Sequence, residues 1–308
     1  MKQRSSLWQT SGYLLAYAGI YVVTLWCLHH FEHSDLSDPL LVLVVVGICF
    51  SGLAWWFTGH VNPLPFTIRR PGRETAFLAC YLIGAAAFIA WGFNAIETGV
   101  PSEPLRSVVL LAAKLAVFVL LPLALFHQLW GYSFREFLVI GPELLQHWKP
   151  ALWMSLVLIM FQLAFGRGLS EIRHSGVPMW GLIMGIPACY IWLLVEVGLV
   201  EEFFTRSLLQ SRLSAWLHSE AGGIVLASLL FGLAHAPGLY YRTGKTLEAV
   251  GPHPSWLMAI GYSVVVVSVP GLFMGVLWSR TRNLLLLMTV HAAGDLVPQL
   301  APMLKTWL

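Results

Sequence analysis

The sequence predicts an all-α fold, a polytopic transmembrane helix bundle of about 8–9 spans. Two observations lead to this prediction. The 308 residues are 57% hydrophobic and only 11% charged, whereas a soluble globular chain carries roughly 25% charged residues. The apolar residues also gather in long runs, and about 20 of them in a row suffice for a helix to cross a bilayer. We therefore expect one integral membrane domain, 1–308, in contact with the lipid bilayer.

Nine apolar runs are candidates for the spans. They cover residues 12–31, 40–58, 75–96, 107–130, 150–166, 178–200, 222–236, 255–279 and 283–303. The first is a span rather than a signal peptide, because it is too long and no small-residue cleavage site follows it. The run at 222–236 is the weakest, since it covers only about 22 Å at 1.5 Å per residue. A short helix buried among the others is the alternative there.

The loops between the runs predict an orientation. Alternate loops are basic, and the others lean acidic, at 31–38 and 97–104. The basic positions are Lys2 and Arg4, Ile68–Arg73, Arg135 and Lys149, Arg206 and Arg212 after the sixth run, and Ser279–Asn283. Basic loops face the cytoplasm, so the N-terminus is expected there. The basic residues are scattered singly between apolar runs, which predicts no nucleic-acid partner.

Ionisable residues inside the spans are concentrated in the C-terminal third. An ionisable group at the centre of a spanning helix costs about 2.5 to 3.5 kcal/mol and usually has a functional reason. These residues are Glu196, Glu201, Glu202, Arg206, His235, His291 and Asp295, against only Lys114 and His127 at comparable depth in the first half. We therefore expect a catalytic core at 176–303 and N-terminal spans of unassigned role at 1–175.

Helix geometry predicts that several of these side chains meet. Helix-like sequence from Trp180 to about Leu213 would be roughly 50 Å long, longer than the ~30 Å hydrocarbon core, so this helix should extend into the cytoplasm. A turn is expected near 216–223, where Ser, Gly and charge cluster. Glu201 and His235 lie about equally far from that turn, so an antiparallel hairpin brings them to one level.

Two pairs of residues four apart complete the predicted pocket. His291 and Asp295 share one helix face, and Glu202 and Arg206 can form an ion pair. A carboxylate in such a pocket can act as general base, and a histidine can orient the same water. A second histidine with a polar partner can stabilise an oxyanion. This set can hydrolyse an amide with water as nucleophile, and there is no GxSxG or cysteine beside these histidines to suggest a covalent one.

Three motifs in order resemble one known family. Glu201-Glu202-x-x-x-Arg206, Phe231-x-x-x-His235 and His291-x-x-x-Asp295 are similar to the CAAX-prenyl-protease and bacteriocin-processing family (CPBP or Abi), the glutamic intramembrane proteases, over about 180–300. The resemblance implies that Glu201 is the catalytic carboxylate and His235 its partner on the water. It implies that His291 and Asp295 form the oxyanion site, and that Glu202, Arg206 and Phe231 support them.

The resemblance also implies an activity, and this sequence differs from the family pattern at two positions. The family activity is an endopeptidase that cuts a membrane-bound or lipidated peptide near the cytoplasmic side, and a bacterial inner membrane fits the family best. The family often has Asn where this chain has Asp295, and an Asp donates a hydrogen bond only when protonated. Asp295 can instead hold the tautomer of His291. The family commonly has a small residue directly after the arginine of the first motif, and this residue is Ser207 here.

Other readings of the same residues stay open. A zinc-dependent membrane protease could use two His with Glu and Asp, although HExxH is absent. A non-catalytic bacteriocin-immunity protein, a membrane scaffold or a transporter is a different class. Glu196 either lines the cavity or pairs with Lys114 or His127. The four cysteines read as small hydrophobes, and neither a metal nor a cofactor is predicted.

Overall fold

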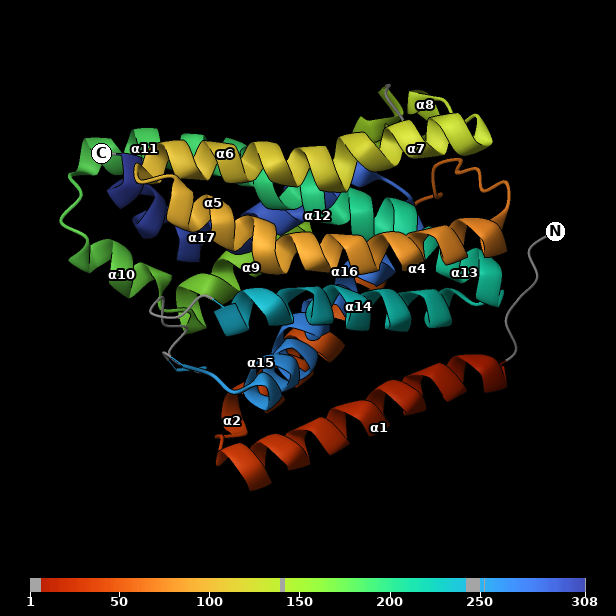
Figure 1. The fold of residues 1–308 in the computed structure, drawn as a ribbon, viewed down its shortest axis with the longest axis horizontal. Helices are drawn as coiled ribbons and strands as arrows, with labels where there is room; N and C mark the ends of the chain where they lie inside the picture. Colours follow the sequence, from red (N-terminus) through yellow and green to blue (C-terminus); the bar gives the residue numbers. More distant parts are fainter. Residues whose placement is uncertain (1–6, 139–141, 242–249, 252, 308) are drawn as a thin grey trace. The chain divides into compact units, whose positions relative to one another are not determined.

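The computed structural model describes residues 7–138, 142–241, 250–251 and 253–307. Within these residues every regular element is helical, as the ribbon in Figure 1 shows. Nine helices in the described part are long and apolar enough to cross a membrane, which confirms the all-α bundle. They are Trp8–Glu32, Ser37–Phe57, Pro71–Gly99, Glu103–Trp130, Leu145–Phe165, Met179–Leu217, Glu220–Tyr241, Trp256–Thr281 and Leu284–Trp307.

The chain divides into two compact units that each combine distant parts of the sequence. The first unit comprises Met1–Trp56, Thr67–Thr98 and Leu208–Ser279, and the second comprises Phe57–Phe66, Gly99–Ser207 and Arg280–Leu308. The predicted subdivision into one membrane domain with an N-terminal part, 1–175, and a core, 176–303, stays a prediction.

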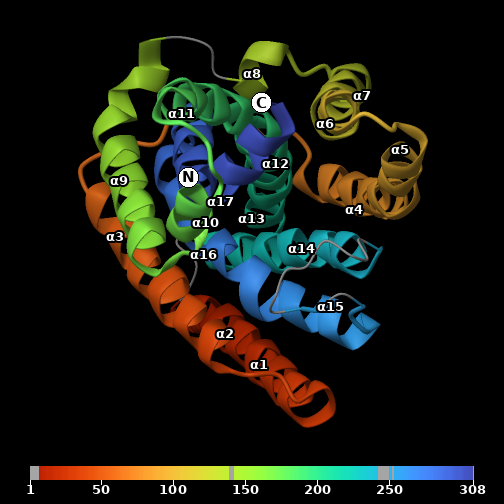
Figure 2. The same cartoon turned by 90° about the vertical axis from the view of Figure 1, so that its left-hand side faces the viewer.

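The first unit is built around helix α14. Its elements are α1 (Leu7–Glu32), α2 (Ser37–Val42), η1 (Leu43–Cys49), α3 (Phe50–Phe57), α4 (Pro71–Ala87), η2 (Phe88–Gly92), α5 (Phe93–Gly99), α13 (Ser211–Leu217), α14 (Glu220–Tyr241), α15 (Trp256–Tyr262), η7 (Ser263–Val267) and α16 (Ser268–Thr281). Helix α14 packs against α1, α13, α15 and η7, and Figure 2 shows it beside α15. Close packing depends on small residues such as Gly232, where an added Cβ would clash with the Ser263 carbonyl oxygen.

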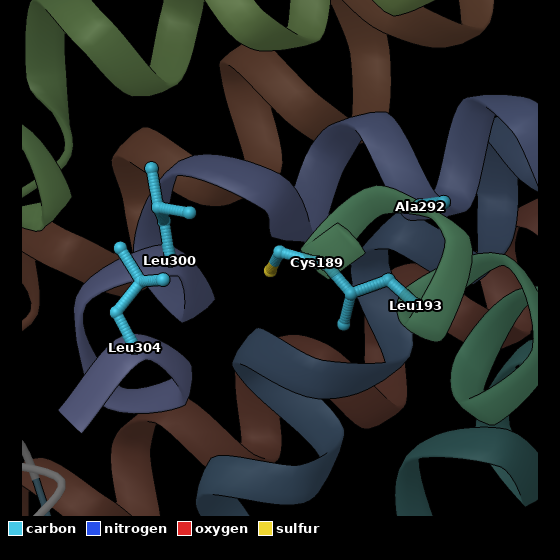
Figure 3. Close-up of a cluster of buried hydrophobic side chains, with 5 residues drawn as sticks. All are labelled: Cys189, Leu193, Ala292, Leu300 and Leu304. Atoms are coloured by element: carbon cyan, nitrogen blue, oxygen red, sulfur yellow. The ribbon is translucent and has the colours of Figure 1, made fainter. Parts of the chain in front are cut away.

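The second unit is built around helix α17. Its elements are α6 (Glu103–Leu115), η3 (Ala116–Leu120), α7 (Leu121–Trp130), α8 (Phe134–Leu138), η4 (Pro142–His147), α9 (Trp148–Phe165), α10 (Gly168–His174), α11 (Met179–Leu193), η5 (Leu194–Leu199), α12 (Val200–Glu202) and α17 (Leu284–Trp307). Helix α17 packs against α9, α10, α11 and η5. Figure 3 shows part of its core, where Cys189 and Leu193 of α11 meet Ala292, Leu300 and Leu304 of α17.

Asn283 fixes where α17 begins. Its side-chain oxygen accepts a hydrogen bond from the Leu286 N–H at 3.1 Å, which is the contact of an N-cap residue. Its amide group also lies 3.3 Å from Nδ1 of the buried His147. Helix α17 therefore starts at a defined residue, and this fixes which turn carries His291 and Asp295.

The long helix predicted from Trp180 to Leu213 is confirmed and is somewhat longer. Met179–Leu217 is helical over 39 residues. Two π-helical segments interrupt its α-helix, η5 before Glu201 and η6 (Phe203–Gln210) after Glu202. Arg206 and Arg212, which count among the basic positions after the sixth run, lie inside this helix, as its predicted length requires. Both side chains are fully buried, and each pairs with a carboxylate.

The predicted turn after this helix is also confirmed, but the next helix is longer than expected. His218 ends α13 with a φ of 53°, and α14 already begins at Glu220. The weak run at 222–236 belongs to a helix of 22 residues that passes through Pro237 to Tyr241. The apolar run underestimated it because Glu220 and the polar end of the helix do not add to hydropathy. At 1.5 Å per residue it is about 33 Å long, enough to cross the hydrocarbon core.

Candidate active site

The centre of the candidate site is a buried chain of three side chains in the second unit. Glu202 is 1% exposed, and its Oε2 accepts a hydrogen bond from Nε of Arg206 at 3.1 Å. Its other oxygen, Oε1, lies 2.7 Å from Nδ1 of His291. The predicted pair of Glu202 with Arg206 is therefore present. The sequence did not reveal the contact of Glu202 with His291, because 89 residues separate them.

Gly198 lets the two helices come close enough for this contact. A Cβ on Gly198 would lie 2.9 Å from the carbonyl oxygen of Met288 and 3.0 Å from its Cα. These are backbone atoms, which cannot move aside as a flexible side chain can. Met288 lies one turn before His291 on α17, and Gly198 lies one turn before Glu202. The missing side chain of Gly198 thus brings Glu202 and His291 within hydrogen-bond distance.

The other nitrogen of His291 faces two further carboxylates. Its Nε2 lies 3.9 Å from Oε2 of Glu201 and 3.8 Å from Oδ2 of Asp295. Both distances exceed a direct hydrogen bond. Glu201 is 21% exposed, His291 17% and Asp295 37%, so this side of the ring is more open than the Glu202 side. The structure brings three of the predicted catalytic residues, Glu201, His291 and Asp295, around one ring nitrogen.

The tautomer of His291 is set by Glu202. An ionised carboxylate only accepts hydrogen bonds, so Nδ1 of His291 carries the proton in the 2.7 Å contact. The alternative expectation, that Asp295 holds the tautomer, stays a prediction, and the Oδ2 atom of Asp295 lies 3.8 Å from the opposite nitrogen, Nε2. In the neutral ring Nε2 is then an acceptor, and in the imidazolium it is a second donor. Either form can act on a group placed between Glu201 and Asp295.

His235 and Phe231 lie in the first unit, on helix α14. Nδ1 of His235 lies 2.8 Å from the backbone oxygen of Phe231, and the two rings meet edge to face at 4.8 Å. Because a carbonyl oxygen only accepts, Nδ1 donates and Nε2 is the acceptor of the neutral ring. Such a ring can take a proton. Glu201 belongs to the other unit, so its predicted meeting with His235 stays a prediction.

The comparison with known proteins bears on these same residues. Residues 183–297 match the model of the family described as type II CAAX prenyl endopeptidase Rce1-like. This segment, which we call the Rce1-like segment, is similar to that family. The match confirms the resemblance drawn from the three motifs and implies a CAAX-type membrane protease, a hydrolase. No curated protein and no solved structure matches the chain.

The Rce1-like segment also contains a second polar cluster, at Glu196. Its Oε1 pairs with Nζ of Lys114 at 2.9 Å, and its Oε2 accepts a hydrogen bond from the indole N–H of Trp192 at 2.6 Å. Of the alternatives for Glu196, the pair with Lys114 is present. His127 instead lies 2.7 Å from the backbone oxygen of Tyr132. Trp192 was missed, although its spacing of four residues from Glu196 was a readable signal.

The remaining candidates from the sequence add no further site. Cys189 is buried in the core of Figure 3, while Cys49 and Cys80 are exposed on apolar helices. Among the residues that the structure describes, no group of three or more His, Cys, Asp and Glu is placed to hold a metal ion.

Proposed function

We propose that this protein is an intramembrane endopeptidase of glutamic type. In it a water molecule activated by Glu201 and His235 cleaves a membrane-associated or lipidated peptide near the cytoplasmic side. One observation carries the proposal. Glu202 holds the imidazole of His291 through Nδ1, and the opposite nitrogen faces Glu201 and Asp295 at 3.9 and 3.8 Å. At these distances a small polar group beside the ring can reach both Nε2 and an acid oxygen by hydrogen bonds.

The proposed reaction begins with the attack of water on the peptide carbonyl. Glu201 takes one proton of the water as the oxygen bonds to the carbonyl carbon, and His235 orients that water from its Nε2. The carbonyl oxygen becomes an oxyanion, which His291 in its imidazolium form stabilises by a hydrogen bond from Nε2. The bond to nitrogen then breaks, and the proton held by Glu201 passes to the leaving amine. The products are a carboxylic acid and a free amine.

Asp295 has a different proposed role from the Asn common at its position in the family. As a carboxylate it cannot donate to an oxyanion. It is close enough to the Nε2 side of His291 to stabilise the imidazolium by its charge. In the protonated form it can also donate to the oxyanion, as Asn would. Glu202 and Arg206 act by holding His291 and do not touch the substrate in this proposal.

The family description suggests which substrate to test first. A C-terminal C-a-a-X sequence carries a prenyl group on its cysteine, and a membrane protease with its site among apolar helices suits such a lipidated tail. We propose a location in a bacterial inner membrane with the N-terminus in the cytoplasm, in agreement with the basic loops Ile68–Arg73 and Ser279–Asn283. We propose no nucleic-acid partner.

A cleavage assay with purified protein in lipid nanodiscs tests the activity. The substrate is an internally quenched peptide that ends in S-farnesyl-Cys-a-a-X, and mass spectrometry identifies the products. We expect the wild type to cut after the farnesylated cysteine, and Glu201→Gln to lose at least about 1,000-fold in kcat, within the range of a general base. Glu171→Gln, an exposed acid of α10, is the matched control and should retain full activity. Full activity of Glu201→Gln would contradict the proposal.

The same assay separates the other readings of the site. A zinc-dependent protease would lose its activity after dialysis against EDTA and phenanthroline, and would regain it with zinc. A non-catalytic immunity or scaffold protein would cut no peptide and would retain its biological effect in the Glu201→Gln variant. The proposal requires cleavage that resists the chelators and depends on Glu201.

A further inference from the structure

The cluster of Lys114, Glu196 and Trp192 has no part in the proposed chemistry, and its position calls for an explanation. Lys114 comes from α6, which lies outside the Rce1-like segment. It crosses to Glu196 on η5 at 2.9 Å, with only 18% of the Lys114 side chain and 27% of the Glu196 side chain exposed. Charged side chains at this depth of a spanning helix are rare and normally paired. Here the pair joins an N-terminal span to the helix of Glu201.

The helix between Glu196 and Glu201 has an unusual conformation. Residues Leu194–Leu199 form a π-helical segment, in which the hydrogen bonds run from residue i to i+5. In an α-helix, residues five apart point about 140° away from each other, at 100° per residue. The wider π turn brings Glu196 closer to the face of Glu201. Single π turns inside α-helices are frequent at functional sites.

Both oxygens of Glu196 have a partner, and this fixes the rotation of the π turn. Lys114 holds Oε1 from one side and the Trp192 indole holds Oε2 from the preceding turn. Trp192 also meets Trp307 of α17 edge to face at 5.8 Å. The three contacts together connect α6, α11, η5 and α17, and the last of these carries His291.

We propose that Lys114, Glu196 and Trp192 are positioning residues that hold η5 in the π turn from which Glu201 projects toward His291. The inference rests on the proposed role of Glu201 as general base. It gives the span that contains Lys114, within the N-terminal region of unassigned role, a function in the reaction. A misplaced base slows proton transfer without weakening the binding of the peptide, so the network acts on kcat.

The test is a set of variants assayed with the farnesylated peptide, with rates normalised to folded protein. Lys114→Met and Glu196→Gln should each lower kcat by about tenfold or more, since small misplacements of reacting groups are costly, and should leave KM within about twofold. Trp192→Phe keeps the ring and removes the N–H donor, so it should show a smaller loss in kcat. The double variant Lys114→Met with Glu196→Gln should lose no more kcat than the worse single variant, because both substitutions disrupt the same ion pair.

A matched control lies on the same helix. Glu103→Gln breaks the pair of Glu103 with Arg106 on α6 and should leave kcat unchanged. A purely structural role for Lys114 would lower the yield or the melting temperature and leave kcat per folded molecule at the wild-type value. That result would overturn the inference.

A second readout does not depend on substrate. Dicyclohexylcarbodiimide labels carboxyl groups in membrane proteins, and mass spectrometry gives the rate at Glu201. We expect Lys114→Met to change this rate and Glu103→Gln to leave it unchanged. If Glu201→Gln is inactive but Lys114→Met keeps both the wild-type labelling rate and the wild-type kcat, the proposed function stands and the inference is contradicted. If Glu201→Gln is active, the proposed function fails, and the labelling rate alone decides whether the network positions Glu201.

Discussion

Two arginines of one helix form buried ion pairs, and the two pairs differ in the further group that each contacts. Arg206 pairs with Glu202 at 3.1 Å and Arg212 pairs with Glu74 at 3.0 Å, and all four side chains are at most 1% exposed. The second oxygen of Glu74 accepts from the backbone N–H of Arg70, at the beginning of α4. The second oxygen of Glu202 lies against the imidazole of His291. One pair is therefore connected to a helix terminus and the other to a titratable ring.

The difference teaches how to separate architecture from chemistry in a membrane protein. Burial and pairing alone do not distinguish the two ion pairs, since each pair shields two charges from the surrounding lipid. What distinguishes them is the third partner. Glu74 accepts hydrogen bonds from the Arg212 guanidinium and the Arg70 backbone N–H, which each keep one charge state. Glu202 instead orients a ring whose far nitrogen faces two more carboxylates. The following predictions test this distinction, from the largest expected effect to the smallest.

Substitution of either Glu202 or Glu74 should destabilise the protein, but only the substitution of Glu202 should strongly reduce catalysis. Glu202→Gln and Glu74→Gln each remove one partner of a buried ion pair, at a cost of about 3 to 5 kcal/mol. In Glu202→Gln the new amide also faces the Nδ1–H of His291 or Arg206, both donors, so the ring loses its tautomer. We expect kcat to fall by about 100-fold or more. Glu74→Gln should keep wild-type kcat per folded molecule.

Peptide cleavage and thermal unfolding of the same preparations measure these two effects. Equal losses of kcat in both variants would show that the contact with His291 makes no difference. A stable, active Glu202→Gln would contradict the role given to Glu202 in holding the imidazole.

Gly198→Ala should break the contact between Glu202 and His291 without touching either side chain. The new methyl group would lie 2.9 Å from the Met288 carbonyl oxygen, so η5 and α17 must separate. We expect about a tenfold loss of kcat and a lower melting temperature, although Ala is normally about 1 kcal/mol better than Gly in a helix. Gly294→Ala on α17 is the control, because its Cβ would meet only Leu158 at 3.6 Å. Equal behaviour of the two variants would contradict the close-approach argument.

Asp295→Asn should have a small effect. The amide keeps the shape and can donate to the oxyanion, but it no longer stabilises the imidazolium of His291 by charge. We expect kcat within about threefold of the wild type, whereas Asp295→Ala, which has neither property, should lose about tenfold. Steady-state kinetics on the farnesylated peptide measures both. A complete loss of activity in Asp295→Asn would mean that its charge, and not its hydrogen bond, is essential.

Hydropathy and helix spacing predicted much of the fold and part of the site. The nine spans follow from apolar runs, and the pair of Glu202 with Arg206 follows from its spacing of four residues. Contacts across long sequence separations could not be read, among them Glu74 with Arg212, which lie 138 residues apart. Such contacts depend on how helices pack, and the periodicity of one helix does not contain that information.

The π turns are a second feature that the sequence could not predict at the site. Helical periodicity assumes a constant turn, so it could not indicate the π-helical segment Leu194–Leu199 that precedes Glu201. A different limit applies to Arg212. Its partner Glu74 lies on α4, so the residues around Arg212 in the sequence do not indicate that its side chain is buried.

The most direct test of the central claim is the separation between the Glu201 carboxylate and the His235 imidazole, measured by crystallography of the protein in a lipidic phase. Two hydrogen bonds through one water molecule span about 5 to 6 Å. The account predicts a distance in this range, with a water molecule between the two groups and His291 close by. A separation well above about 10 Å, beyond any bridge of one water molecule, would contradict it.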